Sequence, residues 1–112
     1  MTPIRVLLVE LEPDDLATRT LARALRDEGA EVVYTSAHTA AEVAATAAQE
    51  DVRAVGFVVR SDEHRRMCAE LAGQDGIVVF ATVEEDTPET GGIAVFRDGS
   101  VAAIVAWAEK LG

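Results

Sequence analysis

The stretch that decides the fold is Ile4-Arg5-Val6-Leu7-Leu8-Val9, a short apolar run near the start of the chain. Because its apolar and polar side chains do not alternate, it predicts a strand that is buried on both faces. Strands of this kind belong to parallel sheets with helices on either side. Similar runs, each predicting another strand, occupy residues 31–35, 54–59, 77–81 and 93–96.

Helical patterns separate most of these strands. The first of them places Leu21 and Leu25 on one face and arginines on the other. Pro13 is expected in the first turn of this helix and Gly29 at its end. The acidic segment 84–90 contains a proline and predicts a loop or one short turn. The predicted helices are residues 14–28, 39–49, 62–72 and 101–111.

Alternation of strands and helices implies parallel strands joined by right-handed crossovers. Five such strands in 112 residues predict the order 2-1-3-4-5. The expected fold is therefore α/β, a flavodoxin-like and Rossmann-related three-layer sandwich. Residues 1–112 are expected to form a single domain, because the chain contains no linker, repeat or low-complexity tract.

The charge balance restricts the classes of partner. Twenty acidic residues against ten basic ones leave a net charge of −10, which argues against nucleic acid and anionic membranes. Cys68 is the single cysteine, so an internal disulfide is impossible. No apolar run approaches the roughly 20 residues of a membrane span, and no signal peptide is visible. These features predict a cytoplasmic protein.

In this architecture ligands bind beyond the carboxyl ends of the strands. The loops that begin there start at Glu10, Arg60, Thr82 and Arg97. None of them contains a dinucleotide-binding glycine motif, a phosphate-binding Gly-Lys-Ser/Thr or a Gly-x-Ser-x-Gly elbow. The chain also lacks a Cys/His pair at metal spacing. The sequence therefore predicts no catalytic residues and a protein that is not an enzyme.

Acidic residues crowd the loop after the first strand, where Glu10, Glu12, Asp14 and Asp15 could lie near residues 84–86. Such carboxylates can hold Mg²⁺ or Ca²⁺ through oxygen ligands. The alternative is a solvated acidic rim in which Asp14 and Asp15 favour the N-terminus of a helix electrostatically. We expect the rim, with no bound metal.

Two isolated residues are expected to be structural. His64 stands near the start of the third helix, where a surface or capping role is expected for a lone histidine. Cys68 falls in the middle of the same helix and predicts a buried thiol.

The segment Arg5–Glu10, followed by Glu12-Pro13-Asp14-Asp15, resembles the opening of a response-regulator receiver domain. That resemblance implies a phosphoacceptor aspartate at the end of the third strand and a lysine after the fifth. Here the third strand ends Phe57-Val58-Val59-Arg60, and Arg97 stands near the place of the lysine. Thr82 could stand for the receiver's switch threonine or serine. A pseudo-receiver that accepts no phosphoryl group is therefore one interpretation.

A second resemblance covers nearly the whole chain. It is strongest at residues 39–44 and 50–56, and it resumes at residues 77–79, 92–96 and 99–100. These stretches are similar to the cobalamin-binding domain of the methylmalonyl-CoA mutase type. The resemblance implies the same 2-1-3-4-5 sheet. It also implies a loop with the pattern Asp-x-His-x-x-Gly after the first strand, whose histidine coordinates the cobalt of cobalamin.

The cofactor-binding motifs of that family are altered in this chain. In the first loop Asp14 falls at the place of the histidine and Ala17 at that of the glycine. The family's Ser-x-Leu at the end of the third strand is Val58-Val59-Arg60, and its Gly-Gly after the fourth strand is Ala81-Thr82. These changes remove the axial ligand, a hydrogen bond and the space for the nucleotide tail. His64 falls where many members carry a histidine.

The sequence thus predicts a non-catalytic domain that binds no cobalamin and acts as a protein-interaction or regulatory module. Its partner is expected to be another protein, such as a mutase subunit, or a second copy bound through the last helix. The alternatives are a genuine cobalamin-binding subunit without the axial histidine, a pseudo-receiver, and a metal-dependent phosphotransfer protein that uses the acidic loop.

Overall fold

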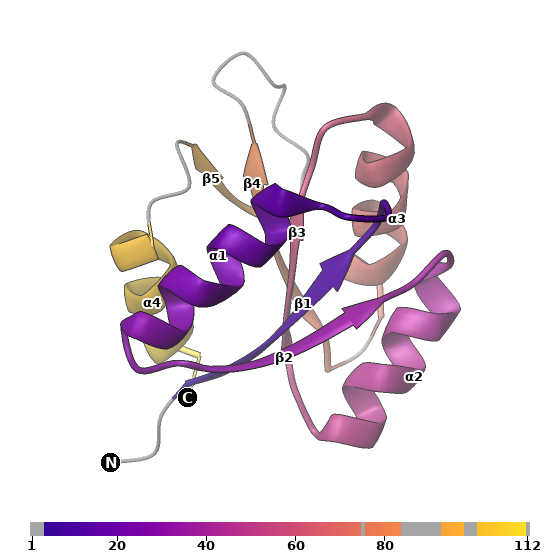
Figure 1. The fold of residues 1–112 in the computed structure, drawn as a ribbon. Helices are drawn as coiled ribbons and strands as arrows, with labels where there is room; N and C mark the ends of the chain where they lie inside the picture. Colours follow the sequence, from indigo (N-terminus) through magenta and orange to yellow (C-terminus); the bar gives the residue numbers. More distant parts are fainter. Residues whose placement is uncertain (1–3, 75, 84–92, 98–100, 112) are drawn as a thin grey trace.

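The computed structural model describes residues 4–74, 76–83, 93–97 and 101–111. Its strands form one five-stranded parallel sheet in the order β2-β1-β3-β4-β5 (Figure 1). The flavodoxin-like α/β class and the strand order predicted from the sequence are therefore confirmed. The strands are β1 (Arg5–Glu10), β2 (Glu31–Ser36), β3 (Ala54–Val58), β4 (Val78–Val83) and β5 (Ala94–Arg97). The helices are α1 (Leu16–Asp27), α2 (Ala40–Glu50), α3 (Asp62–Ala72) and α4 (Val101–Glu109).

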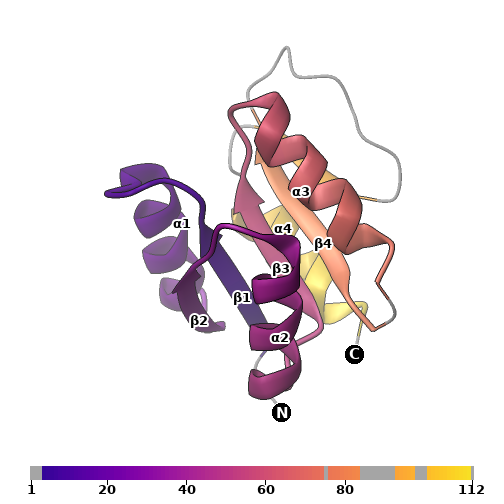
Figure 2. The same cartoon turned by 90° about the vertical axis from the view of Figure 1, so that its right-hand side faces the viewer.

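The sheet is buried on both faces, as the first apolar run predicts. Successive side chains of a strand point to opposite faces. Val6 and Leu8 of β1 pack with α1 and α4, whereas Leu7 and Val9 pack with α2 and α3. All four side chains are fully buried. Figures 1 and 2 show these two helix pairs on opposite sides of the sheet. None of the described helices is long and apolar enough to cross a membrane.

Helix α1 begins two residues later than the sequence predicts. Asp15 is its N-cap, because its side chain accepts the backbone N–H of Thr18. Asp14 lies just before the cap in the left-handed region, with φ of 55°, and cannot be part of the helix. The expectation that Pro13 lies in the first turn is therefore wrong. Gly29 follows the end of the helix with φ of 93°, as predicted.

The second and third helices are capped as their sequences indicate. The hydroxyl of Thr39 accepts the backbone N–H of Glu42, and the two side chains are hydrogen-bonded at 3.1 Å. The hydroxyl of Ser61 accepts the backbone N–H of His64, and Gly73 closes α3. Both hydroxyls satisfy N–H groups that the first turn of a helix leaves unpaired.

Strand β4 is longer than predicted. The sequence places Thr82 and Val83 in a loop, but both belong to the strand. The backbone N–H of Val59 donates to the carbonyl of Thr82 at 2.9 Å, and Val83 pairs in register with Arg97 of β5. Neighbours on both sides therefore keep this backbone extended. The predicted loop at residues 84–90 lies outside the described residues.

An aromatic cluster holds α4 against the sheet. The ring of Phe80 is fully buried, and its centroid lies 5.4 Å from that of Trp107 and 6.3 Å from that of Phe96. The Phe80 ring also covers Gly56, its partner in the register of β3 and β4. A Cβ atom at Gly56 would lie 2.1 Å from the Cζ of Phe80. The position therefore requires a residue without a side chain.

The last helix does not present the surface that the sequence predicts for a dimer. Ile104 and Ala108 are buried in the core formed with α1, and the other three proposed contact residues pack against that core. Four of these residues, Val101, Ile104, Val105 and Ala108, follow the i, i+3, i+4, i+7 spacing of a core-facing stripe, and Trp107 packs against Phe80. The expectation of an exposed apolar face at Val101, Ile104, Val105, Trp107 and Ala108 is therefore wrong.

Candidate functional site

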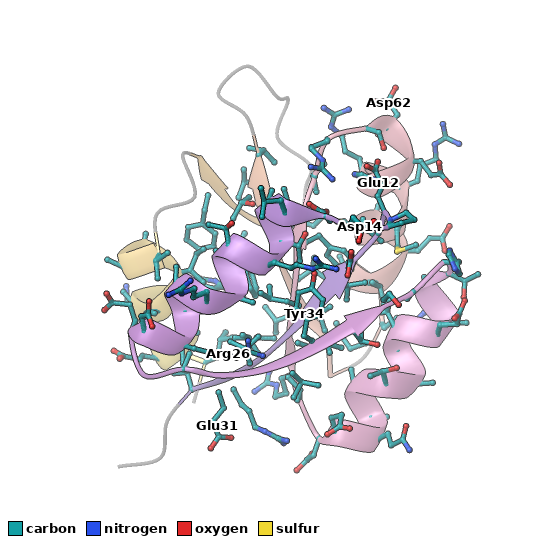
Figure 3. The ribbon with its side chains drawn as sticks, in the orientation of Figure 1. Glu12, Asp14, Arg26, Glu31, Tyr34 and Asp62 are labelled. Atoms are coloured by element: carbon teal, nitrogen blue, oxygen red, sulfur yellow. The ribbon has the colours of Figure 1, made fainter. Side chains whose placement is uncertain are left out.

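Side chains from two loops meet at the point where the strand order reverses, between the carboxyl ends of β1 and β3. Crevices at such switch points are the usual ligand sites of open α/β sheets. Figure 3 shows Glu12 and Asp14 at the same end of the molecule as Asp62, with Glu31 at the opposite end. We call the side chains that join the two loops the polar clasp; it consists of Glu10, Glu12, Asp15, Arg60 and His64.

Asp15 occupies the centre of the polar clasp, with a side chain that is only 1% exposed. One carboxylate oxygen caps α1 at the N–H of Thr18, 3.2 Å away. The other accepts the hydroxyl of Thr18 at 2.8 Å and lies 2.9 Å from a guanidinium nitrogen of Arg60. A carboxylate can be buried in this way because each oxygen has a donor.

Glu10 ends β1 and is only 9% exposed. Its Oε1 accepts the backbone N–H of Asp15 at 2.9 Å, and its Oε2 accepts the hydroxyl of Tyr34 at 3.0 Å. The N–H of Asp15 lowers the pKa of the Glu10 carboxyl, with the Tyr34 bond adding to the effect and burial opposing it. Burial and the bond to Glu10 raise the pKa of the Tyr34 hydroxyl.

Arg60 and His64 close the clasp from the β3 side. The guanidinium of Arg60 also lies 3.3 Å from Oε2 of Glu12, whose Oε1 is 3.3 Å from Nε2 of His64. The backbone N–H of Arg60 donates to Nδ1 of His64 at 3.1 Å. Because Nδ1 accepts this bond, the ring carries a proton on Nε2, the nitrogen that faces Glu12.

Of the two roles expected for His64, at the surface or in a helix cap, the surface position is wrong. Its residue is only 6% exposed, and both ring nitrogens have protein partners. The bond from the backbone of Arg60 draws the ring inward over the start of α3. His64 therefore organises the loop that follows β3 and presents no free nitrogen to a ligand.

The acidic loop is not assembled as a cation site. Among the described residues, no group of three or more His, Cys, Asp or Glu side chains is arranged to hold a metal ion. The oxygens of Glu10 and Asp15 are occupied by protein donors. The Asp14 side chain is 93% exposed and lies 3.5 Å from Arg19, while Glu12 is half exposed. Residues 84–86, the other part of the proposed cluster, lie outside the described residues.

The positions that correspond to cobalamin motifs are spread along the same edge of the sheet. Ala17 is exposed in the first turn of α1. Val58 is half-buried at the end of β3 and pairs in register with Thr82. Ala81 and Thr82 are buried within β4. The side chains of these strand residues thus stand where the resemblance places a serine and two glycines.

The end of β3 also bears on the receiver resemblance. Val58 and Val59 are its last apolar side chains, and Val59 is buried. A receiver would carry its phosphoacceptor carboxylate at this point. The side chain of Arg97, which stands near the receiver's lysine, lies outside the described residues.

Cys68 is buried as predicted, and burial raises the pKa of its thiol to about 12. The thiolate is the nucleophile, and at pH 8 only on the order of one thiol in ten thousand would be ionised. We expect iodoacetamide to label the native protein far more slowly than the urea-denatured chain, as measured by intact mass. Equal labelling rates in the two states would contradict this prediction.

A surface pocket of about 290 Å³ lies at the other edge of the sheet. Its walls include Ala47 from the last turn of α2, Val52 and Arg53 just before β3, and Ile77 just before β4. It therefore does not border the polar clasp and adds nothing to the site at the carboxyl ends of the strands.

Two contacts of the site are absent from the sequence-based prediction. Tyr34 meets Glu10 across 24 positions of sequence, and no local pattern indicates that pairing. Asp15 and Thr18 could have been found, because Asp-x-x-Thr before an apolar periodic run has the spacing of an N-terminal cap.

The geometry defines a flavodoxin-like α/β domain, and comparisons with solved structures agree with this fold. The anti-anti-sigma factor PhyR from Bartonella quintana matches with a TM-score of 0.67 and 18% identity, over 99% of this chain and 49% of that one. A response regulator receiver domain protein from Bacillus halodurans matches with a TM-score of 0.54 and 16% identity, over 99% and 98% of the two chains. Identities this low establish a shared fold and nothing further.

In sequence, the chain is similar to the small subunit of 2-hydroxyisobutanoyl-CoA mutase from Aquincola tertiaricarbonis. The two are 52% identical over 63 residues, which is 54% of this chain and 46% of the relative. The match thus spans about half of that subunit's length. No protein-family model matches the chain. The predicted resemblance to a domain of the CoA-mutase type is confirmed by this similarity.

Proposed function

We propose that this chain is a non-catalytic, mutase-type domain that binds no cobalamin and acts as a protein-interaction subunit. The observation that carries the proposal is the polar clasp. Its internal hydrogen bonds and ion pairs join the loops after β1 and β3 where the related domains require an open loop with a free histidine. Asp14, at the place of that histidine, instead lies next to Arg19 at the surface.

The β4 end of the crevice supports the same proposal. Thr82 is 7% exposed and stands beside Val58 in the register of the two strands. A nucleotide tail that passes close to the backbone needs the space that glycines leave open. Ala81 and Thr82 carry Cβ atoms at the positions where the resemblance places glycines, and Val58 cannot donate a hydrogen bond to the tail.

The proposed partner is the larger subunit of a CoA-mutase-type enzyme. The relative that shares 52% identity over 63 residues is by its name a small subunit, so it works in an assembly. The polar clasp consists of three carboxylates, a guanidinium and an imidazole, and it contains no hydroxyl or thiol nucleophile. An accessory or regulatory role for such a subunit follows.

A cobalamin titration tests the proposed function. The protein is mixed with an equimolar amount of hydroxocobalamin or adenosylcobalamin, desalted, and examined by visible spectroscopy. We expect a colourless protein and no spectral change on mixing, because the axial ligand and the space for the tail are missing. A cobalamin-binding domain of the methylmalonyl-CoA mutase type, carried through the same steps, is the positive control.

Retained colour at equimolar stoichiometry would contradict the proposal. It would favour the alternative of a genuine cobalamin-binding subunit that holds its cofactor without the axial histidine. The spectrum would then show whether the cobalt keeps the cofactor's own base or gains a protein ligand.

A further inference from the structure

Helix α1 carries an unusual row of exposed side chains. Leu16, Arg19, Arg23 and Arg26 are spaced by three, four and three residues, so they form one stripe about 15 Å long on the helix. Leu16 is 74% exposed and is the one large hydrophobic residue with that degree of exposure in the described part of the chain. We call these four residues the arginine stripe. Figure 3 labels Arg26 near its far end, beside β2.

The charge of this stripe opposes that of the rest of the protein. Three of the ten basic residues of the chain lie in it, although the net charge is −10. The one acidic residue of α1 is Asp27, its last residue, which lies four positions after Arg23. The two helical neighbours of Arg23 in the stripe are also arginines, and like charges at these spacings destabilise a helix by a few tenths of a kcal/mol.

Contacts within the described residues do little to neutralise the stripe. Arg19 lies 3.5 Å from Asp14, but both side chains are more than half exposed, so the pair contributes little. Arg26 donates to the carbonyl of Val32 at 3.2 Å and keeps its full charge. Arg23 forms no ion pair with any residue that the structure describes. The described contacts therefore offset only part of the repulsion within the stripe.

We infer that the arginine stripe docks on an acidic face of the larger mutase subunit, with Leu16 inserted into an apolar pocket. This inference rests on the proposed function, which supplies the partner. Arginines and buried apolar anchors are the side chains that dominate protein interfaces. The i, i+3, i+7 spacing is the one by which a helix presents anchors to a groove.

The charge of the stripe and the exposure of Leu16 favour an acidic protein face over a second copy of the chain and over nucleic acid. A second copy of the chain, related by a two-fold axis, would place the arginines of one stripe against those of the other. Nucleic acid would match the charge of the stripe, but its phosphate backbone offers no apolar pocket for the exposed Leu16. An acidic protein face with an apolar pocket matches both the charge of the stripe and the exposure of Leu16.

The test measures calorimetrically the binding of the full chain to the larger subunit of the Aquincola tertiaricarbonis mutase. The variants are Arg23→Glu and Leu16→Gln, neither of which removes a described hydrogen bond. Arg66→Glu makes the same charge change at an exposed position of α3, on the opposite side of the sheet, and is the matched control. We expect each stripe variant to weaken binding about tenfold or more. The control should stay within about twofold, and added salt should weaken binding by the wild type.

The outcomes separate this inference from the proposed function. Binding by the wild type that survives both stripe substitutions would overturn docking through α1 and leave an interaction subunit in place. Loss of binding in Arg66→Glu to the same degree would also overturn it, because net charge alone would then explain the effect. Absence of wild-type binding would overturn the docking, whereas the cobalamin titration decides independently whether the cofactor is lost.

Discussion

Replacement of Phe80 by alanine is expected to lower the free energy of unfolding by about 3–5 kcal/mol, a large share of the stability of a small domain. Phe80 is fully buried and contacts the rings of Phe96 and Trp107. Its loss removes buried apolar area and leaves a cavity between β4 and α4. Urea unfolding followed by circular dichroism and by Trp107 fluorescence would measure the change.

A second substitution tests whether the Phe80 ring packs directly over Gly56. In the wild type, Gly56→Ala is expected to cost about 1–3 kcal/mol, because the new methyl group would lie 2.1 Å from the Phe80 ring. In the Phe80→Ala background the same methyl group enters the vacated space, so its cost should largely disappear. Strictly additive free energies in this double-mutant cycle would contradict the proposed contact.

Asp15→Ala is expected to destabilise the protein by about 2–3 kcal/mol at neutral pH. The change removes the cap of α1 and the buried carboxylate that faces Arg60. Arg60 is 36% exposed and can regain water, which keeps the loss below that of a fully buried pair. Urea unfolding gives the free energy, and hydrogen exchange at the amide of Thr18 should accelerate.

Asp15→Asn is the matched control for the charge. Asparagine caps a helix about as well as aspartate, so the Thr18 amide should keep its protection while the ion pair to Arg60 is lost. We expect this variant to lie between the wild type and Asp15→Ala. If Asp15→Ala were as stable as the wild type, the polar clasp would have no part in stability.

The fold follows closely from the sequence because its signals are local. The apolar run at residues 4–9 and the strand–helix alternation indicate a parallel sheet, and the structure has it. The capping residues Thr39 and Ser61, and the glycine at position 29, mark helix ends through bonds that span at most a few residues. The extension of β4 to Val83 was missed, because it depends on pairing with β3 and β5.

The candidate site could be predicted from the sequence only in part. The sequence indicated which loops to inspect, since these follow from the strand ends. That the cofactor motifs are altered stays a prediction. The sequence did not indicate that Glu10 would meet Tyr34, or which carboxylates of the acidic loop Arg60 would pair with. His64 was expected at the surface or in a helix cap; it is buried, and its Nδ1 accepts the backbone N–H of Arg60 just before α3.

The sequence by itself determined the sheet, its order and the resemblance to a mutase domain, because periodicity and residue identity report local geometry. Only the tertiary structure decided which partners the carboxylates of the acidic loop bind. Asp15 and Arg60 are 45 positions apart, and they meet only because β1 and β3 lie side by side in the sheet. Because the two strands are adjacent, carboxylates of the acidic loop that would repel one another are bonded within the polar clasp. No pattern within the loop could indicate these bonds.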